Sequence, residues 1–425
     1  MKLRDDLQFR GLIHQVTDDA VLEQLSAGGV TVYAGFDPTG PSLHLGHLVP
    51  ILLLRRLQLA GNRPISLAGG GTGLIGDPSF KDVERPLLSA DEIEGNLVTI
   101  RSQLGRFLDF DAGASSALLL NNAQWLTTIP LTDFLRDVGK HFTVNQMIAK
   151  EAVKSRLSRD DVGISFTEFS YSLLQSYDFL RLHLDYGCTL QVGGSDQWGN
   201  ITMGAELVRK VTGATAYGLT LPLLLRADGR KFGKSESGNE NVWLDPARTS
   251  PFAMHQFLLN SDDVVTPQLL RYYTFLSHEE ISELDDAISS APQERRAQRV
   301  LANHVVAMIH GDAAAQSAER AGRALFSDEI RLLDEATLLE IVADAPSSTL
   351  TRAELTAGLD AAELVARCEL ASSKAEARRF LEQGGIYLNN ERIDGSAPID
   401  AASALHDRYL VLRRGRRQTH LVTIA

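Results

Sequence analysis

The chain has 425 residues, which is too many for one ordinary hydrophobic core, so we expect two or three domains. Hydrophobic residues make up 44% and charged residues 23%, as in typical soluble proteins, and the net charge of −12 argues against nonspecific nucleic-acid binding by the whole chain. The two cysteines lack CxxC spacing, so neither a disulfide framework nor a zinc site is expected. No signal peptide and no apolar run of about 18 residues are found in the sequence, so we expect a cytoplasmic protein without a membrane partner.

The first half of the chain predicts a parallel α/β sheet. Residues 1–30 predict one or two short helices that stop at Gly28 and Gly29. Apolar strands alternate with helices after that, and strand–helix–strand over about 40 residues is a βαβ unit. We expect strands at 30–33, 65–68, 118–121 and 190–193, and helices at 48–60, 89–108, 131–138 and 167–183.

The second half predicts two further domains. Residues 249–326 are expected to form an all-α domain, and residues 327–359, which include Ala-Pro-Ser-Ser-Thr at 345–349, a linker. Residues 360–425 predict a small α+β domain, with a capped helix after Ser373 and a hairpin around Asn389 and Asn390. Residues 372–425 carry nine basic and six acidic side chains, so this domain has a local excess of positive charge on an otherwise acidic chain.

A turn between the first strand and its helix carries the first candidate site. It reads YAGFDPTGPSLHLGH over residues 33–47. A strand that turns into a helix presents free backbone N–H groups and the positive end of a dipole, which suits phosphate. Metal ligation by His44 and His47 is an alternative, but no third ligand follows at an obvious spacing. Capping or surface histidines are the structural alternative, and Gly46 fits the close approach of a phosphate or base.

A second candidate lies in a glycine-flanked loop, where residues 231–235 read KFGKS. Two lysines around a glycine suit mobile ammonium groups that close on polyphosphate. A solvated basic loop would have the same composition, so this segment alone does not establish a site.

Taken together and in this order, the two segments resemble the HIGH and KMSKS signatures of the class I aminoacyl-tRNA synthetases. Within that class, the chain is similar to the bacterial tyrosyl-tRNA synthetases. The resemblance extends over GDP at 76–78, YSLLQSYD at 171–178, QVGGSDQWGN at 191–200, and a C-terminal part similar to an S4 RNA-binding domain.

The resemblance implies a Rossmann-like catalytic domain at 1–226, a KMSKS-type loop at 227–248, a helical anticodon-side domain at 249–326, and an S4-like domain at 360–425. It implies activation of L-tyrosine with ATP, with release of pyrophosphate, and transfer of tyrosine to the terminal ribose of tRNA(Tyr). ATP with Mg²⁺, tRNA and a second copy of the chain in a homodimer are the implied partners. We expect the Mg²⁺ to be held largely by phosphate and water, without a protein-bound structural metal.

The resemblance also assigns residues to roles. For tyrosine, these are Tyr33, Asp77, Tyr171, Gln175, Asp178 and Gln197, of which Tyr33 and Asp178 would satisfy the phenolic hydroxyl. For ATP, they are Asp37, Gly46, His47, Gly193, Asp196 and Lys234. Catalysis would rest on Thr39, His44, His47, Lys81, Arg85, Lys231, Lys234 and Ser235, and RNA binding on Lys374, Arg378, Arg379, Arg413, Arg414, Arg416 and Arg417.

Two other functions are compatible with parts of the sequence. Residues 71–76 match G-x-G-x-x-G after a strand, with Asp91 to Glu94 near the expected acidic position, as in nicotinamide oxidoreductases. Asp77 and Pro78 interrupt the helix that this motif requires. A noncatalytic RNA-binding protein is the other alternative, and the intact His44, His47, Lys231 and Lys234 argue against it. Ala34 and Pro50 depart from the family pattern, and the sequence gives no functional account of Pro50.

Overall fold

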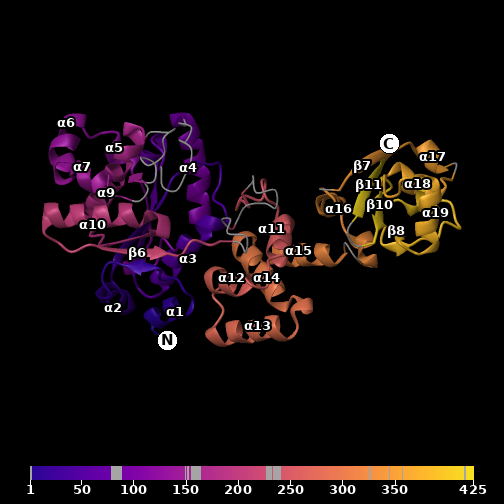
Figure 1. Ribbon diagram of the computed structural model, residues 1–425, viewed down its shortest axis with the longest axis horizontal. Helices are drawn as coiled ribbons and strands as arrows, with labels where there is room; N and C mark the ends of the chain where they lie inside the picture. The colour runs from indigo at the N-terminus through magenta and orange to yellow at the C-terminus, as the bar shows by residue number, and fades with distance from the viewer. Residues whose placement is uncertain are drawn as a thin grey trace. The chain divides into compact units, whose positions relative to one another are not determined.

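The computed structural model describes residues 2–77, 89–148, 150, 153–154, 164–225, 232, 241–324, 327–343, 345–356, 358–415 and 418–425. The chain divides into two compact units, each of which is described by itself (Figure 1). One unit consists of Met1–Thr249 and Ser261–Leu301, and the other of Ser250–Asn260 and Ala302–Ala425. In the described part of the chain, no helix is long and apolar enough to span a membrane.

The first unit is built on a six-stranded sheet in the order β1-β6-β5-β2-β3-β4. All neighbours are parallel except β1, which runs antiparallel to β6. The strands are β1 Gln15–Val16, β2 Thr31–Phe36, β3 Arg63–Ala68, β4 Leu118–Asn121, β5 Leu190–Gly194 and β6 Tyr217–Leu221. The parallel α/β prediction is confirmed, with all four expected strands in place, and the structure adds β1 and β6.

The order of these strands determines where a site can lie. From β2 the chain moves outward to β3 and β4, whereas β5 and β6 are added on the other side of β2. The connections that follow β2 and β5 therefore diverge and leave a crevice at the carboxyl ends of these two strands, where open α/β sheets bind their ligands.

Helices cover this sheet, and most of them lie where the sequence predicts them. They are α1 Leu3–Phe9, α2 Ala20–Ala27, α3 Leu45–Leu59, α4 Ala90–Leu104, α5 Ala123–Leu126, α6 Leu131–Asp133, α7 Val144–Ile148, α9 Phe166–Tyr186 and α10 Trp198–Thr212. The expected helix at 131–138 is α6 followed by a π-helical turn. Helices α9 and α10 lie side by side (Figure 1).

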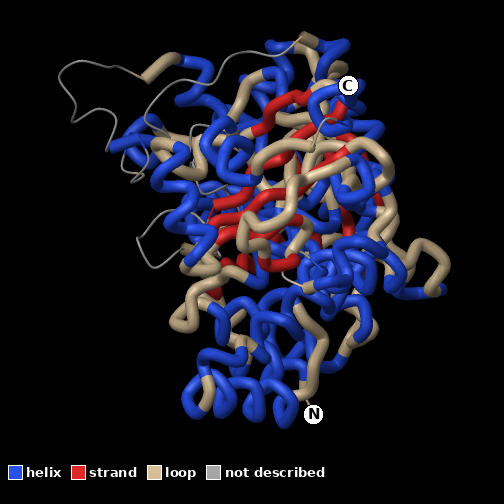
Figure 2. Tube along the Cα trace, turned by 90° about the vertical axis from the view of Figure 1, so that its right-hand side faces the viewer, coloured by secondary structure: helices blue, strands red, loops and turns tan. Residues whose placement is uncertain are grey.

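The helical region is divided between the two units, which corrects the prediction of one separate domain at 249–326. Its described residues 249–324 form helices and connecting loops without a strand. Figure 2 shows the strands of the molecule in red and its helices in blue. Helices α12 Thr266–Tyr273 and α13 His278–Ser290 belong to the first unit, α11 Pro251–Leu259 and α15 Asp312–Ala324 to the second, and the division falls within α14 Arg296–His310.

Hydrogen bonds explain why α12 belongs to the first unit. The buried Arg10 guanidinium donates to the carbonyls of Arg271, Thr274 and Leu276. The Tyr273 hydroxyl donates to the carbonyl of Leu45 at 2.8 Å. These buried bonds tie the end of α12 to α1 and to the start of α3, and leaving such groups unpaired is costly.

The second unit contains a five-stranded sheet in the order β7-β11-β10-β8-β9. Its strands are β7 Ser347–Leu350, β8 Ile386–Leu388, β9 Glu391–Arg392, β10 Tyr409–Arg414 and β11 Gln418–Ile424, and its helices α16 Glu335–Ile341, α17 Arg352–Thr356, α18 Ala361–Arg367 and α19 Lys374–Glu382. The predicted linker at 327–359 is therefore wrong for most of its length. Strand β7 pairs in parallel with β11, and Leu350 and Leu355 are buried in the core of this sheet.

The predicted hairpin around Asn389 and Asn390 is confirmed. Strands β8 and β9 pair antiparallel, and the two asparagines have φ values of 48° and 67°, as a tight two-residue hairpin requires. The buried Asn390 amide donates to the carbonyls of Ala324 and Ser327, and its oxygen accepts from Nε of Arg413. The turn thus holds the end of α15 against the C-terminal sheet.

We expect Asn390→Ala to lower the free energy of unfolding of the second unit by about 1–3 kcal/mol, because two buried carbonyls and the Arg413 guanidinium lose a partner. Denaturant titration of the full chain measures the change. Gln316→Ala, on the exposed face of α15, is the matched control and should shift stability by less than about 0.5 kcal/mol. Equal stability of the two variants would contradict this role of Asn390.

Candidate active site

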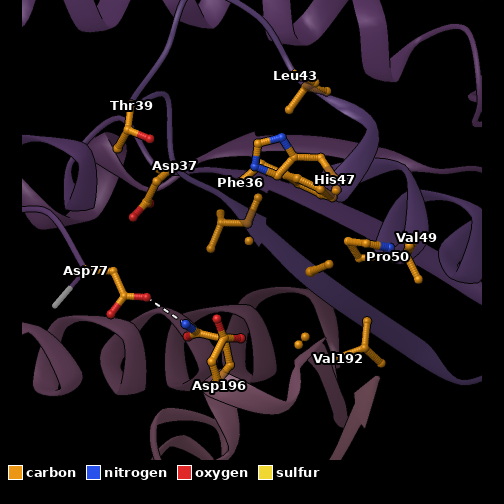
Figure 3. A pocket seen from close by; sticks show the side chains of 18 of the residues that line it. Phe36, Asp37, Thr39, Leu43, His47, Val49, Pro50, Asp77, Val192 and Asp196 are labelled. Atoms are coloured by element: carbon orange, nitrogen blue, oxygen red, sulfur yellow. Dashed lines mark hydrogen bonds between the residues drawn. The ribbon is translucent and has the colours of Figure 1, made fainter. Parts of the chain in front are cut away.

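A cavity of about 710 Å³ lies in the first unit at the carboxyl ends of β2 and β5. The tyrosine-site and ATP-site residues that the sequence predicted all line it, as far as the structure describes them: Tyr33, Asp37, Thr39, His44, Gly46, His47, Asp77, Tyr171, Gln175, Asp178, Gly193, Asp196 and Gln197. Lys81, Arg85, Lys231, Lys234 and Ser235 lie outside the described residues. In Figure 3, Thr39 and His47 lie across the cavity from Asp77 and Asp196.

The deep end of the cavity places a carboxylate near an unpaired hydroxyl. Asp178 on α9 is 2% exposed and Tyr33 at the end of β2 is 1% exposed. The Tyr33 hydroxyl has no hydrogen-bond partner among the described residues. Burial and the nearby Asp178 raise the pKa of Tyr33 well above its ordinary value. Since an unpaired buried hydroxyl is costly, this end is suited to a ligand with a polar group of its own.

Two donors that the sequence did not predict hold Asp178 in place. Trp125 Nε1 donates to one carboxylate oxygen at 2.7 Å, and Asn122 Nδ2 donates to the other at 2.9 Å. Burial raises the pKa of Asp178 to about 7, and the two hydrogen bonds act in the opposite direction by favouring the ionised form. The sequence signal that could have indicated such a donor is the pair Asn121 and Asn122, which are polar residues at the end of an apolar strand.

The hydrogen-bond network continues from Asn122 to a second carboxylate. Asn122 Nδ2 also donates to Thr72 Oγ1, which donates to Asp37 at 2.7 Å. The Tyr171 hydroxyl donates to the other oxygen of Asp37 at 2.8 Å. Burial, followed by the charge of Asp37, raises the pKa of Tyr171 well above its ordinary value. Asp37, which the resemblance assigns to ATP, therefore also orients Tyr171.

The glycine-rich turn at 71–76 contributes Thr72 and the Gly71 N–H to this hydrogen-bond network and does not begin a dinucleotide-binding helix. Residues Thr72–Leu74 form a 3₁₀ turn. The Gly71 N–H donates to Asn122 Oδ1 at 2.8 Å, and a Cβ atom at Gly71 would lie 2.9 Å from Leu126. The glycine permits close packing of this turn on helix α5, which removes the structural basis of the oxidoreductase alternative.

Three polar side chains of the next cavity wall, Asp77, Gln175 and Gln197, are joined by hydrogen bonds. Gln197 Nε2 donates to Asp77 at 2.6 Å, the bond drawn in Figure 3. Gln175 and Asn200 both donate to Gln197 Oε1. Lys150 donates to Asn200 Oδ1 at 3.3 Å, and burial lowers the pKa of Lys150 to about 7. These bonds fix the amide of Gln197 in one orientation.

His44 and His47 cap helix α3, and this fixes their tautomers. Nδ1 of His44 accepts from the Gly46 N–H at 3.0 Å, and Nδ1 of His47 accepts from the His44 N–H at 3.2 Å. A neutral imidazole that accepts at Nδ1 carries its proton on Nε2. Each ring therefore carries an Nε2–H donor. The two rings stack with their centroids 3.8 Å apart. The capping alternative and the ligand-binding prediction are therefore compatible.

The His44 ring requires a glycine at position 46, which the sequence alone does not reveal. A Cβ atom at this position would lie 2.9 Å from Cε1 and 3.0 Å from Nδ1 of His44. Only glycine lets the His44 ring fold back onto the first turn of α3. For the metal alternative, the described residues contain no group of three His, Cys, Asp or Glu side chains that could hold an ion.

Helix α4 holds the turn between β2 and α3. Asn96 donates to the carbonyl of Pro38 at 2.9 Å. Gln103, which is 6% exposed, accepts from the Leu43 N–H at 2.9 Å and donates to Ser42 Oγ at 2.8 Å. Neither residue was predicted, because an isolated Asn or Gln on an amphipathic helix gives no functional signal. Together they restrain both ends of the turn that carries Thr39 and His44.

The predicted RNA-binding residues of the second unit fall into two groups. Lys374, Arg378 and Arg379 of α19 are exposed, each within ion-pair distance of an acidic side chain. Arg413 is 5% exposed and donates to Asn390 and to the Gly415 carbonyl, so it is a structural residue, which corrects the prediction. Arg414 donates to Leu370 O and lies 4.0 Å from the Phe380 ring centroid. Arg416 and Arg417 lie outside the described residues.

Comparisons with known proteins agree with this geometry. Residues 26–327 match the family model of tRNA synthetases class I (W and Y), and residues 338–422 match a tyrosine–tRNA ligase SYY-like C-terminal domain. The chain is 52% identical over 425 residues to the tyrosine–tRNA ligase of Roseiflexus castenholzii, with 99% of both chains covered. It is 48% identical over 428 residues to that of Geobacillus stearothermophilus, with 100% of both covered.

A solved structure shows the same fold. The structure of a C-terminally truncated mitochondrial tyrosyl-tRNA synthetase from Aspergillus nidulans superimposes with a TM-score of 0.69 at 31% identity. The alignment covers 76% of this chain and 94% of that one.

We expect Trp125→Phe to raise the pKa of Asp178 above about 7, because the indole N–H that favours the ionised carboxylate is lost. NMR titration of ¹³C-labelled aspartate, assigned with Asp178→Asn, measures the value. Trp198→Phe is the control, since its side chain makes no hydrogen bond to Asp178. An unchanged or lower pKa in Trp125→Phe would contradict the role of Trp125.

Proposed function

Because the chain belongs to the tyrosine–tRNA ligases of the class I tRNA synthetases, we propose that its cavity binds tyrosine at the deep end and ATP at the outer end. The chain is an enzyme that activates L-tyrosine with ATP to tyrosyl-adenylate and pyrophosphate, and then transfers tyrosine to the terminal ribose of tRNA(Tyr). The observation that carries the residue assignment is the unpaired Tyr33 hydroxyl beside the carboxylate of Asp178.

At the deep end, the substrate phenol donates to Asp178 and accepts from Tyr33. Such a hydroxyl gives the buried Tyr33 hydroxyl a partner and donates a further hydrogen bond to Asp178, whereas phenylalanine leaves the Tyr33 hydroxyl unpaired and is rejected. Asp77, Tyr171 and Gln175 hold the substrate ammonium, and Gln197 lies near its carboxylate. The hydrogen bond between Tyr171 and Asp37 supports this arrangement, since it holds the phenol of Tyr171 in one position.

In the first reaction, a carboxylate oxygen of tyrosine attacks the α-phosphorus of ATP. A bond forms between that oxygen and the phosphorus while the bond to the β-phosphate oxygen breaks, and pyrophosphate leaves with the electron pair. No side-chain nucleophile or base is needed, so positioning and charge stabilisation carry the step. The Nε2–H of His44 and the hydroxyl of Thr39 donate to the phosphates as charge develops on them.

Other residues complete the ATP site. His47 and Gly46 face the ribose and base, and Gly193 and Asp196 hold the ribose. Lys81, Arg85, Lys231, Lys234 and Ser235, all outside the described residues, close over the pyrophosphate. Mg²⁺ enters with ATP and is held mainly by phosphate oxygens and water.

The tRNA is bound in part by the basic face of α19, where Lys374, Arg378 and Arg379 are exposed. Arg414 binds the tRNA as well, together with Arg416 and Arg417, which follow it in the sequence and lie outside the described residues. The enzyme acts in the cytoplasm, where tRNA is charged.

The active form is a homodimer. Five exposed apolar side chains lie on α6, the π-helical turn after it, α7 and the first residue of α9, beside residues that pack in one buried core, which supports a second copy of the chain as the occupant of this surface. They are Leu131, Leu135, Val144, Ile148 and Phe166.

The activity is tested by ATP–pyrophosphate exchange with each amino acid in turn. Tyrosine alone should support exchange, since only its hydroxyl satisfies both Tyr33 and Asp178. Exchange with none of the amino acids would refute the function, and equal exchange with phenylalanine would refute the assignment of Tyr33 and Asp178.

The role of His44 is tested by His44→Asn. Asparagine remains a good helix N-cap but lacks the Nε2–H donor, so the rate of tyrosine activation should fall roughly 100-fold while tyrosine affinity stays within about twofold. His14→Asn, an exposed histidine outside the cavity, is the control. Weakened tyrosine binding with an unchanged rate would contradict the role of His44.

The dimer is tested by Phe166→Asp. Phe166 is 79% exposed, and a charge there should shift the chain toward monomer in sedimentation velocity, because a buried unpaired charge is costly at an interface. Val264→Asp, in the turn before α12 at an apolar position that is 85% exposed, should leave the oligomeric state unchanged. A monomeric wild-type chain, or a Phe166→Asp variant that remains dimeric, would refute the proposal.

A further inference from the structure

Residues 241–245 return to the turn that carries His44. Their backbone forms an antiparallel bridge in which His44 lies opposite Trp243. The Leu45 N–H donates to the Val242 carbonyl at 3.0 Å, and the Leu244 N–H donates to the Leu43 carbonyl at 2.8 Å. One hydrogen bond on each side of the pair fixes Trp243 in register with His44.

The burial pattern determines where the Trp243 side chain points. Val242 is 5% exposed and Leu244 is 1% exposed, and successive side chains of an extended segment point to opposite faces. With both neighbours in the core, Trp243 must face the other way, and its side chain lines the cavity together with His44. The Trp243 N–H donates to Thr249 Oγ1 at 2.9 Å, which anchors this segment to the chain that follows.

The indole ring contacts the turn between β2 and α3 at two positions, His44 and Gly40. It meets the His44 ring edge-on at a centroid distance of 6.1 Å and an interplanar angle of 62°. A Cβ atom at Gly40 would lie 3.3 Å from the indole, so the ring packs directly on the backbone there. The His44 ring is thus held by His47, which stacks on it, by the Gly46 N–H at Nδ1 and by Trp243.

We propose that Trp243 is a positioning residue for tyrosine activation, which holds the His44 ring so that its Nε2–H is aimed at the phosphates. Trp243 forms no bond with the reacting atoms and acts through His44. This inference rests on the role of His44 proposed above. An edge-on aromatic contact restrains a ring enough to change a rate by roughly two- to tenfold, and loss of alignment at a reacting group adds to this.

A double-mutant cycle in the full chain tests the proposal. Trp243→Leu should lower kcat of tyrosine-dependent ATP–pyrophosphate exchange roughly tenfold, with the KM values for tyrosine and ATP within about twofold. Trp243→Phe, which keeps an aromatic ring, should recover most of that loss. In the His44→Asn background, Trp243→Leu should cost less than about twofold, because the group it positions is already absent.

Three results would overturn the inference. The first is an unchanged kcat in Trp243→Leu. The second is that Trp243→Leu lowers the rate as much in the His44→Asn background as in the wild-type chain. The third is a rise in the KM for ATP in Trp243→Leu with kcat unchanged, which would mean that the indole binds ATP directly. If Trp243→Leu does not fold, Thr249→Val releases the backbone anchor while keeping the indole, and its smaller loss of kcat should show the same dependence on His44. Wild-type exchange with tyrosine is the reference, and its absence would refute the function instead.

Discussion

The site depends on one buried carboxylate and the groups that keep it in place. Asp178 is 2% exposed, and its two oxygens accept from Asn122 and Trp125. A buried charge without such partners would shift toward its protonated form. Burial raises the pKa of Asp178 to about 7 even though both hydrogen bonds favour the ionised carboxylate. The same Asn122 amide reaches Thr72 and, through it, Asp37 and Tyr171. A single network therefore connects Asp178, which we propose recognises the substrate phenol, with Asp37 and Tyr171 in the adjoining cavity wall.

In the part of the cavity that we propose binds ATP, helix capping determines how the two histidines are oriented. The first turn of α3 has N–H groups without helical partners, and the histidine rings of His44 and His47 accept from two of the N–H groups at this end of the helix. That role places both protons on Nε2, where they can serve as donors toward phosphate. Gly46 is required because any side chain would displace the His44 ring. The stability of the helix end and the tautomers of both histidines are thus consequences of the same hydrogen bonds.

The sequence predicted the parallel sheet and the cavity-lining residues because both follow from local patterns and from a family resemblance. It did not reveal Thr72, Asn122 and Trp125, since their contacts join loops distant in the sequence. The linker prediction was wrong at Ser347–Leu350, whose polar residues form a strand only because β11 provides a partner. Arg413 was misassigned because a basic run on a strand looks uniform in sequence, although β10 is covered on both faces and stays buried up to Arg413.

The central claim is that the substrate phenol lies between Tyr33 and Asp178. A crystal structure of the full chain with bound L-tyrosine tests it most directly. The account predicts the phenolic oxygen within hydrogen-bond distance of both Tyr33 Oη and the Asp178 carboxylate, with the bonds from Asn122 and Trp125 retained. A structure in which the substrate ammonium meets Asp178, or in which the Tyr33 hydroxyl stays unpaired beside the bound amino acid, would contradict it.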